Sequence, residues 1–162
     1  MFGLWKSKKV KKEKIKAVLQ ALTLMSAADG EIDDSEAQLI AGCFDLIKEH
    51  FDFKGSIEAD FMQKLYDLDE LLENEDKGLL LALLASVLVV DTRADYNEIM
   101  CFKGFIYRMG LDPSDFSEML EEIFSTFNVD QTVFEEYEKF ALDHGREKAN
   151  EAFADRVKYL SK

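Results

Sequence analysis

Apolar residues recur at spacings of three and four along most of this chain, which is the period of an amphipathic α-helix. With its polar interruptions, the pattern predicts helices at residues 11–28, 33 or 34 to 50, 56–73, 75–90, 95–109 and 113–127, a seventh around 133–141, and a last helical stretch carrying Ala149, Phe153, Val157 and Leu160. The inward face expected for the helix at 56–73 consists of Ile57, Phe61, Leu65, Leu68 and Leu72. One proline and eight glycines also suit long helices better than a turn-rich β fold.

The segment from Lys14 to Ile47 reappears in chemical outline sixty-two positions later. An Asp-x3-Asp-x2-Glu pattern stands in both copies, at Asp29, Asp33 and Glu36 and again at Asp91, Asp95 and Glu98. The apolar positions around it match as well: Val18, Leu19, Ala21, Leu22, Leu39, Ile40, Cys43, Phe44 and Ile47 pair with Leu80, Leu81, Leu83, Leu84, Cys101, Phe102, Phe105, Ile106 and Met109.

These patterns predict an all-α protein, a compact bundle of about seven to eight helices built from a duplicated three-helix unit. Residues 1–12 form a basic N-terminal tail, and residues 13–162 form a single domain. Within it, repeat one covers about 14–74, repeat two about 75–127, and the C-terminal helices about 130–160. A three-helix unit alone would expose one apolar face, so we expect the two repeats to share a core.

The overall charge of −13 conceals an asymmetry. Residues 1–16 carry seven lysines and one glutamate, so the remaining 146 residues carry −19. An acidic body repels phosphates and attracts cations or basic partners, which argues against nucleic-acid binding.

The two cysteines and the apolar segments indicate a cytoplasmic protein. Cys43 and Cys101 lie on apolar helix faces without a CxxC or Cys/His pattern, as expected of buried free thiols in a reducing compartment. The apolar run at 79–90 is too short for a bilayer core, which needs about 20 residues. The lysines followed by residues 17–28 imitate a signal peptide, but this segment matches the buried helix of the second repeat, so we expect it to be retained.

The duplicated acidic residues have two interpretations. Asp33 with Glu36, and Asp95 with Glu98, each fit a capping box, which would give them a purely structural role. Asp29 and Asp91 fit this account less well, because each follows the expected end of a helix, where a carboxylate is unfavourable unless a basic group or a cation compensates it. A bound ion would have only oxygen ligands, which suits Ca²⁺, Mg²⁺ or Mn²⁺ better than Zn²⁺.

The segment Met25–Glu36, MSAADGEIDDSE, resembles the signature of the tellurite-resistance TerB-like family. In that family a helix ending in Ala-Asp-Gly turns into a second helix opened by acidic residues, and the motif recurs after a long apolar helix. The resemblance covers about residues 14–127 and is closer in the first copy. It implies a compact fold of about seven helices, a role in bacterial stress responses beside other proteins or membranes, and a relation to domains found in some J-domain co-chaperones.

The same resemblance implies an acidic, metal-binding site. Carried over by position, its candidate ligands are Asp29, Asp33, Glu36, Asp91, Asp95 and Glu98. The second copy departs from the family pattern at Thr92 and Arg93, and the charge of Arg93 can replace a cation in that loop.

The N-terminal segment combines apolar side chains with dense positive charge. Contact with an anionic membrane surface would involve Phe2, Leu4, Trp5, Lys6, Lys8 and Lys9. The alternative is a solvated tail whose aromatic residues fold back onto the acidic body. Membrane contact would place the protein at the inner face of the cytoplasmic membrane.

Catalytic signatures are absent from the sequence: no nucleophile elbow, phosphate-binding loop or dinucleotide fingerprint is present, and His50 and His144 fall near predicted helix ends. We therefore expect a non-catalytic stress-response module of the tellurite-resistance type, without an organic cofactor, that binds a divalent cation and acts with other stress-response proteins. The alternative is a helical adaptor for a protein or a membrane surface, in which the acidic residues are only helix caps. A metal-dependent hydrolase is a remote third option.

Overall fold

The computed structural model describes the backbone of residues 2–28, 34–90, 93–94, 96–127, 130–153 and 160–161, and the side chains of residues 7–28, 34–90, 96–127 and 130–153. Its elements in chain order are α1 (Phe2–Ser26), α2 (Asp34–His50), the 3-10 helix η1 (Ala59–Met62), α3 (Leu68–Leu71), α4 (Asn74–Val90), β1 (Arg93–Ala94), α5 (Tyr96–Arg108), the 3-10 helix η2 (Pro113–Phe116), α6 (Ser117–Thr126), α7 (Gln131–His144), α8 (Arg146–Ala152) and β2 (Leu160–Ser161). The prediction of an all-α bundle of seven to eight helices is confirmed by the eight α-helices of this described part.

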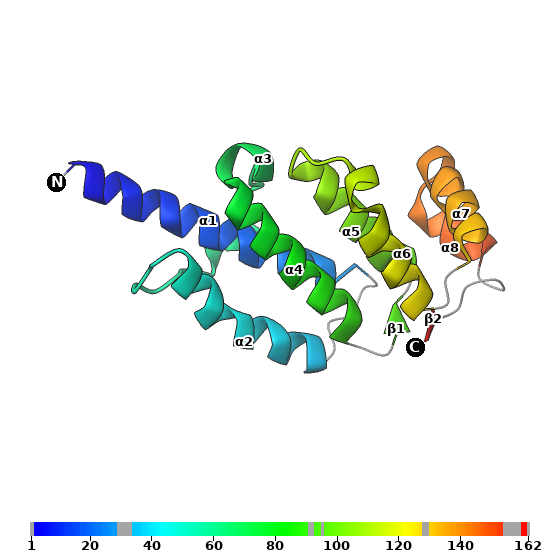
Figure 1. Ribbon diagram of the computed structural model, residues 1–162, viewed down its shortest axis with the longest axis horizontal. Helices are drawn as coiled ribbons and strands as arrows, with labels where there is room; N and C mark the ends of the chain where they lie inside the picture. The colour runs from blue at the N-terminus through cyan, green and yellow to red at the C-terminus, as the bar shows by residue number, and fades with distance from the viewer. Residues whose placement is uncertain are drawn as a thin grey trace.

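Two helices form the centre of the fold. α1 packs most extensively against α4; α2 contacts both of them, and α5 also packs on both (Figure 1). Residues 15–22 of α1 are all buried. The apolar run of α4 buries one broad face, which includes Leu80, Leu84 and Leu88, while Ala82 on the opposite side is exposed. This wide apolar face explains the central place of α4.

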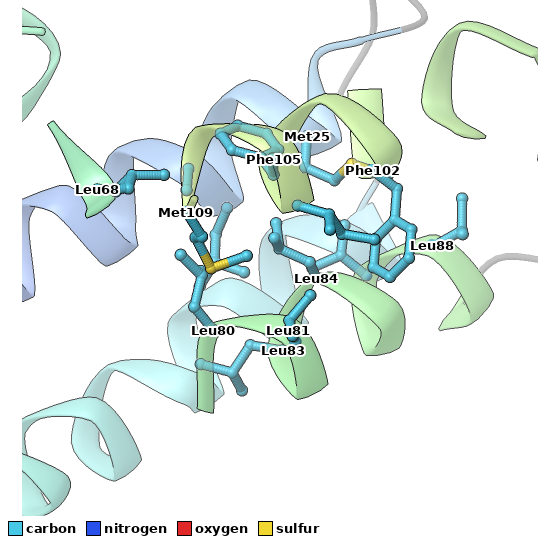
Figure 2. Close-up of a cluster of buried hydrophobic side chains, with 14 of the residues drawn as sticks. Met25, Leu68, Leu80, Leu81, Leu83, Leu84, Leu88, Phe102, Phe105 and Met109 are labelled. Carbon is cyan, nitrogen blue, oxygen red and sulfur yellow. The ribbon is translucent and has the colours of Figure 1, made fainter. Parts of the chain in front are cut away.

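The core lies where these helices meet. Figure 2 shows Met25 of α1, Leu84 of α4 and Phe102 of α5 among its side chains, all essentially inaccessible to solvent. Leu68 of α3 closes the same cluster. In the described part of the chain, no helix has the length and apolar character needed to cross a bilayer.

The repeat is visible in the burial of matched positions. Val18, Leu19, Ala21 and Leu22 are buried in α1, as are Leu80, Leu81, Leu83 and Leu84 in α4. The hairpins α1–α2 and α4–α5 therefore correspond, and each presents the same apolar face to the shared core.

The third members of the two units differ. The long helix predicted at 56–73 is wrong: this segment forms η1 and the single turn α3 with non-helical chain between them, and Leu65 is 79% exposed. α1 stabilises this non-helical conformation, because Gln20 Nε2 donates to the carbonyl oxygens of Phe61 and Lys64. Asp67 then caps α3 by accepting from the Glu70 N–H at 3.1 Å.

The two ends of the chain also differ from the prediction. α1 begins at Phe2 rather than near Lys11, so the backbone of residues 2–12 continues the central helix. At the other end, α8 stops at Ala152, and the helix expected to reach Leu160 is wrong there. Leu160 instead lies in β2, which pairs antiparallel with β1 opposite Ala94.

Candidate functional site

Two of the six predicted carboxylate ligands lie within the described residues. Asp29, Asp33, Asp91 and Asp95 lie outside them. α2 begins at Asp34 and α5 at Tyr96, so Glu36 and Glu98 are each the third residue of a helix, the position that a capping box requires. The two glutamates are only 4% and 5% exposed, and neither is without a partner.

A buried hydroxyl lies at the end of α1, three residues before Asp29 in the sequence. The Ser26 hydroxyl is fully buried and has no hydrogen-bond partner among the described residues. Other helical hydroxyls bond to the carbonyl four residues earlier, as Thr23 does to Leu19 at 2.8 Å. Among the described side chains, no group of three or more His, Cys, Asp or Glu residues could hold a metal ion. The four aspartates of the predicted site lie outside these side chains.

Sequence reasoning missed a third buried carboxylate, Asp76 in the first turn of α4. One of its oxygens lies 2.8 Å from His50 Nε2, and the other accepts from the Glu73 N–H at 3.0 Å and lies 3.2 Å from Lys14 Nζ. Burial alone would raise the pKa of Asp76, but its bonds to His50, Glu73 and Lys14 hold the pKa below its usual range. Here amino-acid side chains satisfy a buried carboxylate in the first turn of a helix.

The predicted membrane-contact residues lie in the first part of α1. We call residues 2–10 the arm; in Figure 1 it extends beyond the other helices at the N-terminal end. The side chains of Phe2, Leu4, Trp5 and Lys6 lie outside the described ones. Residues 7–10 are exposed, and Lys8 and Lys9 make no ion pair within the described part of the chain.

The lysines that follow the arm attach α1 to the body. Lys12 Nζ lies 3.1 Å from a Glu58 oxygen, and Lys16 Nζ lies 3.3 Å from Glu58 and 2.9 Å from Asp60. Hydrogen bonds from its own backbone N–H, Lys12 and Lys16 lower the pKa of Glu58 to about 2. The bond to Asp60, acting against burial, raises the pKa of Lys16. These lysines serve the fold, which leaves Lys8 and Lys9 available for a partner.

A surface depression adjoins the base of the arm. It encloses about 570 Å³ between α1 and the segment 52–55. Three of its lining residues are lysines, Lys8, Lys11 and Lys54, and Lys11 Nζ donates to the Asp52 carbonyl at 3.4 Å. The depression extends the positive surface of the arm onto the body.

Comparison of the chain with models of protein families, with curated proteins and with solved structures finds no match. The resemblance to the TerB-like family therefore stays a prediction from the motif.

Proposed function

We propose that this protein is a non-catalytic helical adaptor that attaches to anionic membrane surfaces through its arm. The observation that carries the proposal is the continuity of α1. Its lysine-rich first part extends beyond the other helices (Figure 1), while its second part is buried in the core. Because the arm and the buried part belong to one helix, a surface that binds the arm also fixes the orientation of the whole domain.

The charges of the arm favour an anionic lipid surface. Each lysine near such a surface contributes about 1 kcal/mol, and Trp5 and Phe2 are residue types that favour the interface. Lys8 and Lys9 thus supply about 2 kcal/mol.

The arm is long enough to reduce the electrostatic repulsion between the acidic body and an anionic surface. Nine helical residues span about 13 Å. The Debye length at physiological ionic strength is about 8 Å, so body charges behind the arm are largely screened from a surface at its tip. The acidic body then stays solvated and can bind a second protein.

Vesicle co-sedimentation tests this proposal. The full chain should bind vesicles containing phosphatidylserine and not those of phosphatidylcholine alone. Lys8→Glu/Lys9→Glu should weaken binding roughly thirtyfold or more, since at least about 2 kcal/mol is lost. Lys139→Glu/Lys148→Glu is the matched control, because it reverses two exposed charges on α7 and α8. Equal binding by the two double variants, or no binding by the wild type, would refute the proposal.

A second candidate is a divalent-cation response of the acidic segments, in the manner of the TerB-like resemblance. It is supported by the burial of Glu36 and Glu98 at matched positions and by the unpartnered Ser26 hydroxyl before the first segment. A hydroxyl and carboxylates are ligands that Ca²⁺, Mg²⁺ and Mn²⁺ accept.

The test is a titration of the labelled, chelator-treated protein with each ion, followed by backbone amide shifts, or by line broadening for Mn²⁺. Saturable changes confined to residues 29–36 and 91–98, weakened by Asp29→Asn, are expected. Amides that stay unchanged up to millimolar ion would leave the carboxylates as helix caps.

A further inference from the structure

A cavity of about 410 Å³, open to solvent on one side, lies between the end of α1, one face of α5 and the start of α8. This volume falls in the range of about 300–1,000 Å³ typical of small-molecule sites. Its apolar walls are formed by Leu24, Ala27, Ala28, Met100, Gly104 and Phe105. None of these residues belongs to the arm or is a predicted cation ligand, although Ala27 and Ala28 stand in the motif Met25–Glu36. The cavity is therefore a site distinct from the two proposed above.

Small residues keep this cavity open. Gly104 stands in the interior of α5, where glycine is less favourable than alanine, yet a Cβ added there would meet no atom within 4 Å. Ala27 and Ala28 line the cavity from the end of α1. Larger side chains at these positions would reach into the space.

Two arginines give the cavity a charged edge. Arg108 and Arg146 both line it, and neither forms an ion pair with any residue of the described part, although the chain has 33 acidic residues. Arg108 is fixed by a 3.2 Å bond from its Nη2 to the Tyr66 carbonyl and by its stacking on Phe105 at 5.1 Å. A guanidinium has five N–H donors, so this bond leaves others for a ligand.

Cys101 completes the lining as an apolar group. Burial raises the pKa of its thiol, and the charges of Arg146 and Arg108 only partly oppose this effect. The thiol is therefore uncharged at neutral pH and does not compensate the arginines.

We propose that this cavity binds a small anionic amphiphile, an aliphatic chain with a terminal carboxylate. The apolar chain lies against Met100 and Gly104, and the carboxylate lies between Arg108 and Arg146. Arginine pairs with carboxylates in a planar, two-bond geometry. Two arginines without an ion pair among the described residues, beside an apolar hollow, match the two ends of such a ligand.

Titration of the labelled full chain with decanoate, below its micelle concentration, tests this proposal. Saturable amide shifts at residues 24–28 and 100–105 are expected, together with slower alkylation of Cys101 by iodoacetamide. Cys43, which is buried in α2, serves as the internal reference for alkylation. Decanol has the same chain without the charge and should bind about tenfold more weakly.

Two variants separate specific binding from general adhesion. Gly104→Leu should abolish the decanoate shifts by filling the cavity, whereas Gly42→Leu, at the matched exposed position of α2, should leave them unchanged. Arg146→Gln, an exposed substitution that spares the core, should weaken decanoate about tenfold and leave decanol unaffected. Absence of saturable shifts, equal affinity for decanol, or unchanged affinity in Arg146→Gln would each overturn the proposal.

Discussion

Replacing Asp76 by asparagine tests how α1, α2 and α4 are joined. The ionised carboxylate accepts hydrogen bonds from His50 of α2 at 2.8 Å and from the Glu73 N–H at 3.0 Å. It also lies 3.2 Å from the ammonium of Lys14 in α1. Asparagine has nearly the same shape, but only one of its two terminal atoms is an acceptor.

The loss of stability expected for Asp76→Asn follows from these contacts. Turned toward Glu73 and Lys14, the NH₂ group faces donors, and turned toward His50 it requires the tautomer in which Nε2 is an acceptor. In either orientation the charge-assisted bonds and the attraction of the carboxylate to Lys14 are lost. Such bonds contribute about 1.5–3 kcal/mol, so we expect the free energy of unfolding to fall by about 2 kcal/mol. In a protein of this length that lowers Tm by about 4–8 °C.

The pH dependence gives a sharper signature than the loss itself. Because the pKa of Asp76 is lowered in the folded state, its charge stabilises the fold above the unfolded-state pKa near 3.8, and this contribution is lost as pH falls through the folded-state pKa. Urea denaturation of wild type and variant should therefore show their largest difference above about pH 5 and a shrinking difference toward pH 3.

Asp45→Asn is the control, since it removes the same charge from an exposed position of α2. It should change the free energy of unfolding by less than about 0.5 kcal/mol at every pH. A stability difference between wild type and Asp76→Asn that is independent of pH would refute the assigned role of the charge.

Four further substitutions test the packing. Gln20→Leu should lower the free energy of unfolding by about 1–3 kcal/mol in urea titrations, because two carbonyls between η1 and α3 lose their donor; an unchanged midpoint would contradict that role. Leu84→Ala should cost about 2–5 kcal/mol and Leu65→Ala less than about 0.5 kcal/mol, and similar thermal shifts for both would argue against the interrupted segment. Gly42→Ala should raise stability by about 0.5–1 kcal/mol in calorimetry, since nothing crowds an added Cβ, whereas a loss would indicate a missed contact.

The helices that the sequence predicts well are those whose local signals agree with their packing. α4 follows from an apolar run that buries one broad face in the core, and the starts of α2 and α5 follow from acidic residues at the first turns. Asp112 and Pro113 likewise mark a true start, with Asp112 accepting from the Ser114 N–H at 2.9 Å, although the first turn is the 3-10 helix η2. The repeat was detectable because matched apolar positions face the same core.

The features that the sequence does not predict depend on interactions between residues that are distant in the sequence. The spacing of Leu65 fits a helix, but the donor that stabilises the interrupted chain there is Gln20, over forty residues earlier. The partnership of Asp76 with Lys14 and His50, and the meeting of Arg108 with Arg146 beside a cavity, also depend on tertiary packing. No pattern of neighbouring residues in the sequence predicts such sites.

Fluorescence of Trp5 with anionic vesicles tests membrane attachment by the arm most directly. It is the only tryptophan of the chain, so its emission reports the arm alone. We predict a saturable shift to shorter wavelength with phosphatidylserine vesicles, reversal at high salt, and no shift in Lys8→Glu/Lys9→Glu. Emission that stays unchanged at saturating anionic lipid, or that shifts equally with neutral vesicles, would contradict attachment through the arm.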